Sequence, residues 1–109
     1  MNKTILITGA AKRIGKEIAL TYCDLGWNII IHYNSSKKDA EELAQNINSK
    51  NPGTAKIVQA NLDIDSEVKR LVEESKNFFD TIDILVNNAS TFYPTPIDEI
   101  SDDHWMKLV

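Results

Sequence analysis

The sequence lacks the features that mark several classes of protein. It contains a single cysteine, Cys23, so no disulfide can form within the chain, and the apolar residues at helical spacing around it favour a buried structural thiol. No apolar run reaches the roughly 18 residues that a membrane span needs, and the first residues lack the apolar stretch of a signal peptide. We therefore expect a cytoplasmic protein with no membrane partner.

The charge of the chain is weakly negative and evenly spread. The 12 Lys and Arg residues and 16 Asp and Glu residues give a net charge of −4, without the basic cluster that binds nucleic acid. Only three prolines and four glycines occur in 109 residues, and 42% of the residues are hydrophobic, which is typical of an ordinary globular domain. The length allows one domain, for which we expect a small-molecule partner, no nucleic acid and no metal ion.

Four short apolar runs predict strands. They are Ile5-Leu6-Ile7, residues 28–33, residues 55–60 and residues 82–86, and they are rich in β-branched side chains. The first two runs are too continuous to alternate between apolar and polar residues. They are therefore expected to form strands that are buried on both faces.

Three helical patterns separate these runs. Gly26 supplies a left-handed stop for the first helix, Ser36 begins a capping-box spacing for the second, and Asp65 can cap the third. The apolar residues at helical spacing are Ile14, Ile18, Ala19, Tyr22 and Leu25, then Ala40, Leu43, Ala44 and Ile47, then Val68, Leu71, Val72 and either Phe78 or Phe79. Alternating strands and helices with short loops require crossover connections, so we predict an α/β fold with helices on both faces of a parallel sheet.

A candidate phosphate-binding loop joins the first strand to the first helix. It reads Thr8-Gly9-Ala10-Ala11-Lys12-Arg13-Ile14-Gly15, and the turn that Gly9 permits would aim main-chain N–H groups at a pyrophosphate. Only two of the three glycines of the general dinucleotide fingerprint are present, so a tight turn in which Gly15 allows close packing stays an alternative. Arg13 can hold a phosphate through two hydrogen bonds, and the other interpretation is an ordinary surface arginine.

The end of the second strand indicates which dinucleotide is bound. An NAD site needs an acidic side chain there, about 20 residues past the loop, to bind the ribose 2′-hydroxyl. The segment instead reads His32-Tyr33-Asn34-Ser35-Ser36-Lys37, whose donors could surround a 2′-phosphate together with a helix N-terminus and Arg13. NADPH is therefore the predicted cofactor. Ser36 can act as a helix cap at the same time, and we interpret His32 as a core or ribose-side residue rather than a titrating catalyst.

Two segments resemble the short-chain dehydrogenases/reductases. They are Thr8-Gly9-x-x-x-Arg13-Ile14-Gly15 and Asn87-Asn88-Ala89-Ser90, and the match is collinear over the whole chain. The generic family has glycine where Arg13 stands and commonly where Ser90 stands, and both replacements are similar to the pteridine reductase branch. The resemblance implies a Rossmann-type doubly wound parallel sheet, truncated to the strand order 3-2-1-4. Residues 1–109 would form the N-terminal dinucleotide-binding half of the domain and would end within the helix after the fourth strand.

The same resemblance implies roles for residues after the third and fourth strands. Asn61, followed by Leu62, stands where the family has an adenine-contacting aspartate. Asn88 and Ala89 would support the adenosine ribose and the central strand.

The resemblance also implies a substrate side. Ser90 would face the nicotinamide and the substrate, and Phe92 would stack on a pterin ring, unless it only packs against the protein. The predicted cofactor-binding residues are thus Gly9, Arg13, Ile14, Gly15, His32, Tyr33, Asn34, Ser35, Ser36, Asn61, Leu62, Asn88, Ala89 and Ser90, and the predicted substrate-binding residues are Ser90 and Phe92.

The family's catalytic pair, a tyrosine with a lysine four residues later, would follow the Asn-Asn-Ala segment. No such pair follows Ser90, and Tyr33 with Lys37 is a chance match because it straddles a strand end and a helix start. We therefore expect no catalytic residue in these 109 residues and an inactive chain. Its parent would be an NADPH-dependent reductase of a pterin-like molecule and a homo-oligomer. A non-catalytic nucleotide-binding module is the alternative, whereas a methyltransferase would need an acidic residue after the second strand.

Overall fold

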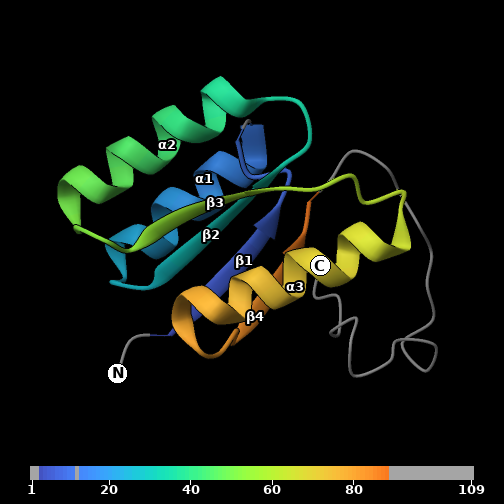
Figure 1. The fold of residues 1–109 in the computed structure, drawn as a ribbon. Helices are drawn as coiled ribbons and strands as arrows, with labels where there is room; N and C mark the ends of the chain where they lie inside the picture. Colours follow the sequence, from blue (N-terminus) through green and yellow to red (C-terminus); the bar gives the residue numbers. More distant parts are fainter. Residues whose placement is uncertain (1–2, 12, 89–109) are drawn as a thin grey trace.

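The computed structural model describes residues 3–11 and 13–88. Strands and helices alternate along them (Figure 1). The elements are β1 (Thr4–Thr8), α1 (Arg13–Asp24), β2 (Asn28–Tyr33), α2 (Lys37–Lys50), β3 (Ala55–Gln59), α3 (Asp65–Phe79) and β4 (Ile84–Asn87). The alternation predicted from the apolar runs is confirmed, and the helix expected after the fourth strand lies outside the described residues.

The four strands form one parallel sheet in the order β3-β2-β1-β4. The chain winds outwards from β1 to β3 and then returns to the other side of β1 with β4, which is the doubly wound pattern. Helices α1 and α2 cover one face of the sheet, and α3 covers the other (Figure 1). The predicted Rossmann-type fold and its strand order are confirmed.

Each face of the sheet has its own apolar core. Ile5 and Ile29 pack under α1 and α2, whereas Leu6 and Ile30 pack under α3. All five residues of β1 are buried. Burying a side chain of this size contributes about 1.5–3 kcal/mol relative to leaving it in water. Successive residues of β1 and β2 pack into opposite cores. Both strands are therefore continuously apolar, which is the pattern from which they were predicted.

Thr4 and Asp83 join the start of β1 to the residue before β4. The Thr4 N–H donates to Asp83 Oδ2 (2.8 Å), and the Asp83 N–H donates to the Thr4 carbonyl (2.8 Å). The register then pairs Ile5 with Ile84 and ends with Thr8 opposite Asn87. In the described part of the chain, β4 pairs with β1 alone. The carboxyl ends of β1 and β4 therefore lie side by side.

The helix ends agree only in part with the sequence predictions. Gly26 has a φ of 81°, which confirms the left-handed stop after α1. Ser36 precedes α2 as predicted, but its side chain makes no capping hydrogen bond. The prediction that Asp65 caps α3 is wrong. Ile64 is the N-cap, and Asp65 is the first helical residue, where its negative charge is favoured by the helix dipole.

Some apolar residues at helical spacing do not reach the core. Ile14 lies in the first turn of α1 and Leu25 lies just beyond its last residue, and these side chains are 66% and 64% exposed. Phe79 packs against the core, whereas Phe78 is half-exposed below the Lys56 ammonium. The spacing therefore predicts the buried centre of each helix and fails at its ends.

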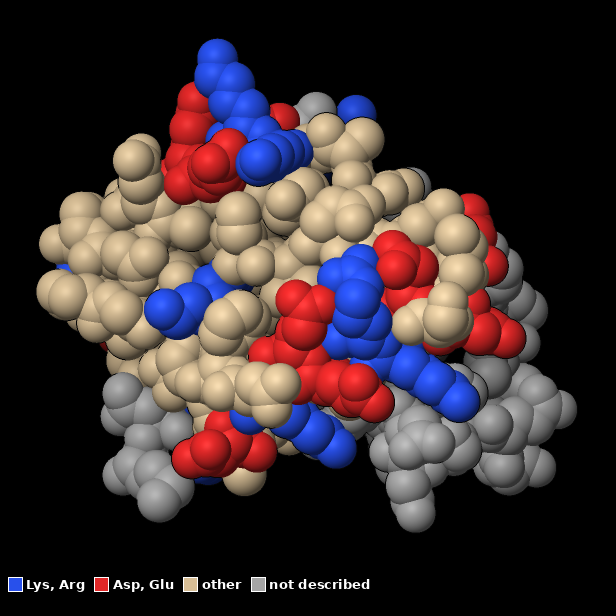
Figure 2. All heavy atoms as spheres, viewed as in Figure 1, with Lys and Arg blue, Asp and Glu red and all other residues tan. Residues whose placement is uncertain are grey.

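The surface over α3 carries charges of both signs. Figure 2 shows Lys and Arg side chains interleaved with Asp and Glu side chains there, without a broad area of one sign. No helix within residues 3–11 and 13–88 is both long and apolar enough to span a bilayer.

Candidate functional site

The predicted cofactor-binding residues that the structure describes lie at the carboxyl ends of the strands. In a doubly wound sheet the ligand crevice lies at these ends, where the strand order reverses. Here the reversal occurs at β1, which has β2 on one side and β4 on the other. The loop after β1 and the start of α1 therefore stand at this reversal of strand order, and the segments that follow β2, β3 and β4 reach the same edge of the sheet.

His32 joins the loop after β1 to the ends of β2 and β3. The Gly9 N–H donates to His32 Nδ1 (3.0 Å), and the Ala10 N–H donates to the His32 carbonyl (3.2 Å). His32 Nε2 lies 2.8 Å from the Ala60 carbonyl. Because Nδ1 accepts a hydrogen bond, Nε2 carries the proton and donates a hydrogen bond to the Ala60 carbonyl. His32 is buried with both ring nitrogens bonded, as expected of a core histidine, and burial lowers its pKa below the usual 6.5.

Gly15 permits the start of α1 to pack against the loop. A Cβ atom on Gly15 would lie 2.6 Å from the Gly9 carbonyl oxygen, 2.7 Å from Asn88 Nδ2 and 2.8 Å from Ala10 Cα. Real Cβ atoms do not approach other atoms so closely, so only glycine fits. The close packing that was considered as an alternative is therefore present. It is compatible with phosphate binding, since close helix packing is one of the roles of glycine in a dinucleotide loop.

Asn88 closes the other side of the loop. Its N–H donates to Thr8 Oγ1 (2.8 Å), its Nδ2 group donates to the Gly9 carbonyl (3.5 Å), and Thr8 Oγ1 donates to Asn87 Oδ1 (3.0 Å). These bonds connect residues about 80 positions apart in the sequence. Asn88 thus fixes the loop after β1 to the end of β4.

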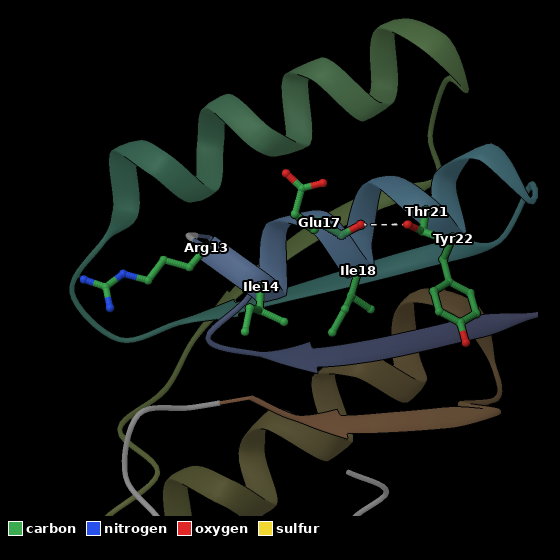
Figure 3. Close-up of a pocket in the computed structure, with 6 residues that line it drawn as sticks. All are labelled: Arg13, Ile14, Glu17, Ile18, Thr21 and Tyr22. Carbon is green, nitrogen blue, oxygen red and sulfur yellow. Dashed lines mark hydrogen bonds between the residues drawn. The ribbon is translucent and has the colours of Figure 1, made fainter.

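Arg13 has an uncommon main-chain conformation. Its φ is 55°, in the left-handed region that glycine occupies readily, and Gly9 in the same loop has a φ of 63°. A non-glycine residue in such a conformation costs about 1–3 kcal/mol, and such residues cluster at functional sites. The signal was present in the sequence, because the generic family has glycine at this position. Figure 3 shows the Arg13 side chain extending off the amino-terminal end of α1.

The segment after β2 presents neutral polar groups. Tyr33 is buried, Asn34 and Ser35 are exposed, and Ser36 is half-buried. Gln59 Nε2 donates to both the carbonyl (3.1 Å) and the Oδ1 atom (3.3 Å) of Asn34. Because Oδ1 is the acceptor in this contact, the amino group of Asn34 is the end left as a donor. No acidic residue occurs at positions 32–36.

Asn61 shapes the turn between β3 and α3. Its Oδ1 atom accepts the Asp63 N–H (3.0 Å), its carbonyl accepts the Ile64 N–H (3.1 Å), and its own N–H donates to Glu67 Oε1 (3.4 Å). Leu62 is partly buried and packs against the core under α3. Asn61 and Leu62, both predicted to bind the cofactor, therefore belong to one turn.

Glu67 and Arg70 support this turn and were not predicted. Arg70 forms salt bridges with Glu67 (2.9 Å) and Glu74 (2.6 Å), and it donates to the Gln59 carbonyl (2.6 Å). The hydrogen bond with Arg70 lowers the pKa of Glu67, and the two carboxylates raise the pKa of Arg70. The spacings of three and four residues are typical of helix-surface pairs and could have revealed the cluster. Sequence spacing gives no sign that Arg70 also reaches β3.

A shallow groove of about 370 Å³ runs along one side of α1 (Figure 3). Its lining residues are Arg13, Ile14, Glu17, Ile18, Thr21 and Tyr22. Within it, the Thr21 hydroxyl donates to the Glu17 carbonyl (3.0 Å). Only Arg13 and Ile14 of the predicted site line the groove. The other described residues of the predicted site do not line this groove.

Part of the predicted site lies beyond the described residues. Ala89, Ser90 and Phe92 fall in this part, so the predicted nicotinamide and substrate contacts are outside the structural description. Within residues 3–11 and 13–88 no group of three or more His, Cys, Asp or Glu side chains is placed to hold a metal ion.

Comparison with known proteins places the chain among related sequences. The family model for short chain dehydrogenases matches residues 3–109. The 3-oxoacyl-(acyl-carrier-protein) reductase of Staphylococcus epidermidis is 35% identical over 109 residues, which are 100% of this chain and 44% of the relative. A short-chain type dehydrogenase/reductase of Picea abies is 34% identical over 114 residues, 97% of this chain and 42% of the relative.

A further similar protein is pteridine reductase 1 of Leishmania tarentolae. It is 37% identical over 109 residues, which cover 84% of this chain and 38% of the relative. The chain therefore spans less than half the length of the curated relatives it matches.

Proposed function

Since the chain belongs to the short chain dehydrogenase family, we propose that residues 1–109 are the cofactor-binding half of an NADPH-dependent oxidoreductase. The observation that carries the proposal is the neutral segment after β2, where Asn34 and Ser35 are exposed and positions 32–36 hold no carboxylate. An NADH site would need a carboxylate here for the ribose 2′-hydroxyl. Arg13 at the start of α1 supplies a guanidinium for the 2′-phosphate instead.

The pyrophosphate would bind to main-chain N–H groups at the start of α1. The N–H groups of Gly9 and Ala10 already bond to His32. The first four N–H groups of a helix have no partner within it, so those of Ile14 and Gly15 are the donors we assign to the anion. This assignment gives Ile14 a role through its main chain, in keeping with its exposed side chain. Bound here, the dinucleotide would supply a hydride from its nicotinamide.

For the substrate we propose a pterin-like heterocycle. The similarity to pteridine reductase 1 over 84% of this chain supports the proposal, together with Arg13 at the position of the family's glycine. Ser90 would face the nicotinamide and the substrate, and Phe92 would stack on the ring. The similarity to a 3-oxoacyl-(acyl-carrier-protein) reductase supplies the competing substrate class that an experiment must include.

We propose that the 109-residue chain binds NADPH without turning over a substrate. Tyr33 is buried at the end of β2 and Lys37 opens α2, so this pair does not lie on one helix as a catalytic pair would. The complete enzyme would be a cytoplasmic homo-oligomer that acts on a small molecule. A module that binds the nucleotide and has no catalytic partner is the alternative function.

Cofactor binding is tested by calorimetric titration of the chain with NADPH and with NADH. We expect tighter binding of NADPH, and a loss of about 10- to 100-fold in NADPH affinity in R13A, because a hydrogen bond to a charged group contributes about 1.5–3 kcal/mol. The matched control is K16A, which removes the same charge from an exposed position of α1. Equal affinity for the two dinucleotides would overturn the NADPH assignment.

The substrate is tested by following NADPH oxidation. A dihydropteridine and a 3-oxoacyl thioester are offered in parallel to the 109-residue chain and to any longer protein that contains it. We expect no turnover by the chain, and turnover of the pteridine by the longer protein. Turnover of the thioester alone would reject the pterin, and binding without turnover by the longer protein would favour the binding module.

A further inference from the structure

His32 lies where the two predicted nucleotide-binding loops meet. Its Nδ1 atom accepts the N–H of Gly9 in the loop after β1, and its Nε2 atom donates to the carbonyl of Ala60, the residue before Asn61. Main-chain hydrogen bonds link the same segments. The His32 carbonyl accepts the Ala10 N–H, and the Tyr33 carbonyl accepts the Ala60 N–H (3.1 Å). One side chain thus bridges the phosphate loop and the turn assigned to adenine.

Only one form of the imidazole satisfies both contacts. Gly9 offers a donor and Ala60 an acceptor, so the ring must be neutral with its proton on Nε2. If Nδ1 were also protonated, its N–H would face the Gly9 N–H, and the hydrogen bond between them would be lost. Because His32 is only 3% exposed, water could not replace the lost hydrogen bond without movement of the loop.

The charged groups around this bridge lie on β3 and α3. Lys56 of β3 points to the far end of α3, where its ammonium lies over Phe78. Near the carboxyl end of β3, Glu67 and Glu74 form salt bridges with Arg70, and Arg70 also bonds to the Gln59 carbonyl. From β1 the neighbouring side chain is Thr8, which does not titrate. Burial and the Ala60 bond, rather than a charged partner, therefore govern the protonation of His32.

We infer that His32 is a positioning residue for the dinucleotide: in its neutral form it holds the phosphate loop and the β3–α3 turn in one arrangement, and its protonation weakens dinucleotide binding. The inference rests on the proposed function for its ligand, but the hydrogen bonds themselves are independent of any ligand. Through Gly9, the protonation state of the ring affects Asn88, whose Nδ2 group donates to the Gly9 carbonyl, and Gly15, which has no room for a Cβ atom beside that carbonyl.

The hydrogen bonds of His32, which do not depend on a ligand, are tested first by nitrogen NMR of the 109-residue chain. Above neutral pH the imidazole nitrogens of His32 should report a bare Nδ1 and a protonated Nε2. On acidification the Gly9 amide signal should shift together with the His32 ring. A His32 ring with its proton on Nδ1, or a Gly9 amide that does not respond, would overturn the inference whether or not the chain binds a dinucleotide.

The affinity part is tested by measuring NADPH binding from about pH 8 to about pH 5.5. The 2′-phosphate itself titrates near pH 6, so the quantity that matters is the difference between variants. H32Q keeps one acceptor and one donor but does not titrate, and H32F keeps the ring shape without either bond. We expect the wild type to lose about tenfold more affinity than H32Q per pH unit below the point where His32 protonates.

At pH 8 we expect H32F to bind NADPH about tenfold more weakly than H32Q, or worse, because phenylalanine replaces neither hydrogen bond of the His32 ring. The matched control is H104Q, which removes the other histidine of the chain and should keep the wild-type pH profile. Identical pH profiles of the wild type and H32Q would overturn the inference. Failure of all variants to bind either dinucleotide at any pH would reject the proposed function instead, and the NMR result would then decide on His32 alone.

Discussion

Gly15 lies against Gly9 so closely that a Cβ atom on Gly15 would stand 2.6 Å from the Gly9 carbonyl oxygen. Since that oxygen also accepts the Asn88 Nδ2 group, the contact involves α1, the loop and β4 together. Its tightness makes the loop geometry testable by very small substitutions.

G15A should weaken NADPH binding beyond its effect on stability. The added methyl group has to push the loop, the Asn88 side chain or the start of α1 away, and each of these lies at the proposed pyrophosphate site. We expect a decrease of about 1–3 kcal/mol in the free energy of unfolding, as for other overpacked positions, and a loss of about tenfold or more in affinity. Urea unfolding and calorimetric titration measure the two effects.

G26A provides the matched control for this substitution. Gly26 has a φ of 81° but open space around its Cβ position, so alanine there costs about 1 kcal/mol of stability through the main chain alone. NADPH affinity should stay at the wild-type value. If G26A weakened binding as much as G15A, the effect would be one of general stability and not of loop geometry.

R13G should stabilise the chain while it harms NADPH binding. Glycine relieves the strain of the φ of 55°, which we expect to raise the free energy of unfolding by about 1 kcal/mol. The guanidinium assigned to the 2′-phosphate is lost at the same time, so affinity for NADPH should fall while affinity for NADH changes little. A variant that is both less stable and unchanged in its preference would contradict the role of Arg13.

His32 should make the stability of the chain depend on pH. Burial lowers its pKa in the folded state, whereas in the unfolded chain it titrates near 6.5. Between these two values His32 binds a proton in the unfolded chain and not in the folded chain, so its contribution to the free energy of unfolding falls as pH decreases through this window and is constant above it. H32Q should remove this slope. Urea unfolding at a series of pH values would measure it, and a wild-type slope of opposite sign would show that His32 gains a proton on folding.

R70A should affect the adenine side of the site more than it affects stability. Arg70 is exposed in part, so solvent screens its two salt bridges and they contribute little to the stability of the chain. However, the hydrogen bond from Arg70 to the Gln59 carbonyl and the hydrogen bond from the Asn61 N–H to Glu67 fix the turn assigned to adenine. We expect weaker binding of adenosine 2′,5′-bisphosphate in R70A and normal binding in K69A, whose side chain is exposed on the same helix. Equal losses in the two variants would point to net charge alone.

The sequence predicts the sheet because its first two apolar runs are too continuous for a strand with one face in water. The runs at Ile5 and Ile29 can be buried on both faces only in a sheet between helices, and the alternation of strands and helices then requires parallel strands. Helix ends are harder to predict, because spacing cannot show where a helix leaves its neighbours. For this reason the helical spacing includes Ile14 and Leu25, whose side chains are exposed, and it predicts Asp65 as a cap although this residue lies inside α3.

The sequence predicts which residues form the candidate site better than it predicts the contacts and hydrogen bonds between them. Gly9, Gly15 and Asn88 were identified from motifs, and the structure brings all three into one contact. The left-handed conformation of Arg13 and the double bonding of His32 depend on how separate segments pack, which spacing along the chain does not record. The cofactor roles of these residues stay predictions.

The pairing of Thr4 with Asp83 has a consequence for the order in which the molecule assembles. β1 meets β2 across about 24 residues but meets β4 across 79, and closing the longer loop costs about 1 kcal/mol more in chain entropy. We therefore expect β1, α1 and β2 to associate early in folding and β4 to dock late, so that D83A speeds unfolding more than it slows refolding. Asn88 arrives with β4. The crevice that gives the chain its proposed function is then the last part of the fold to form and the first to open.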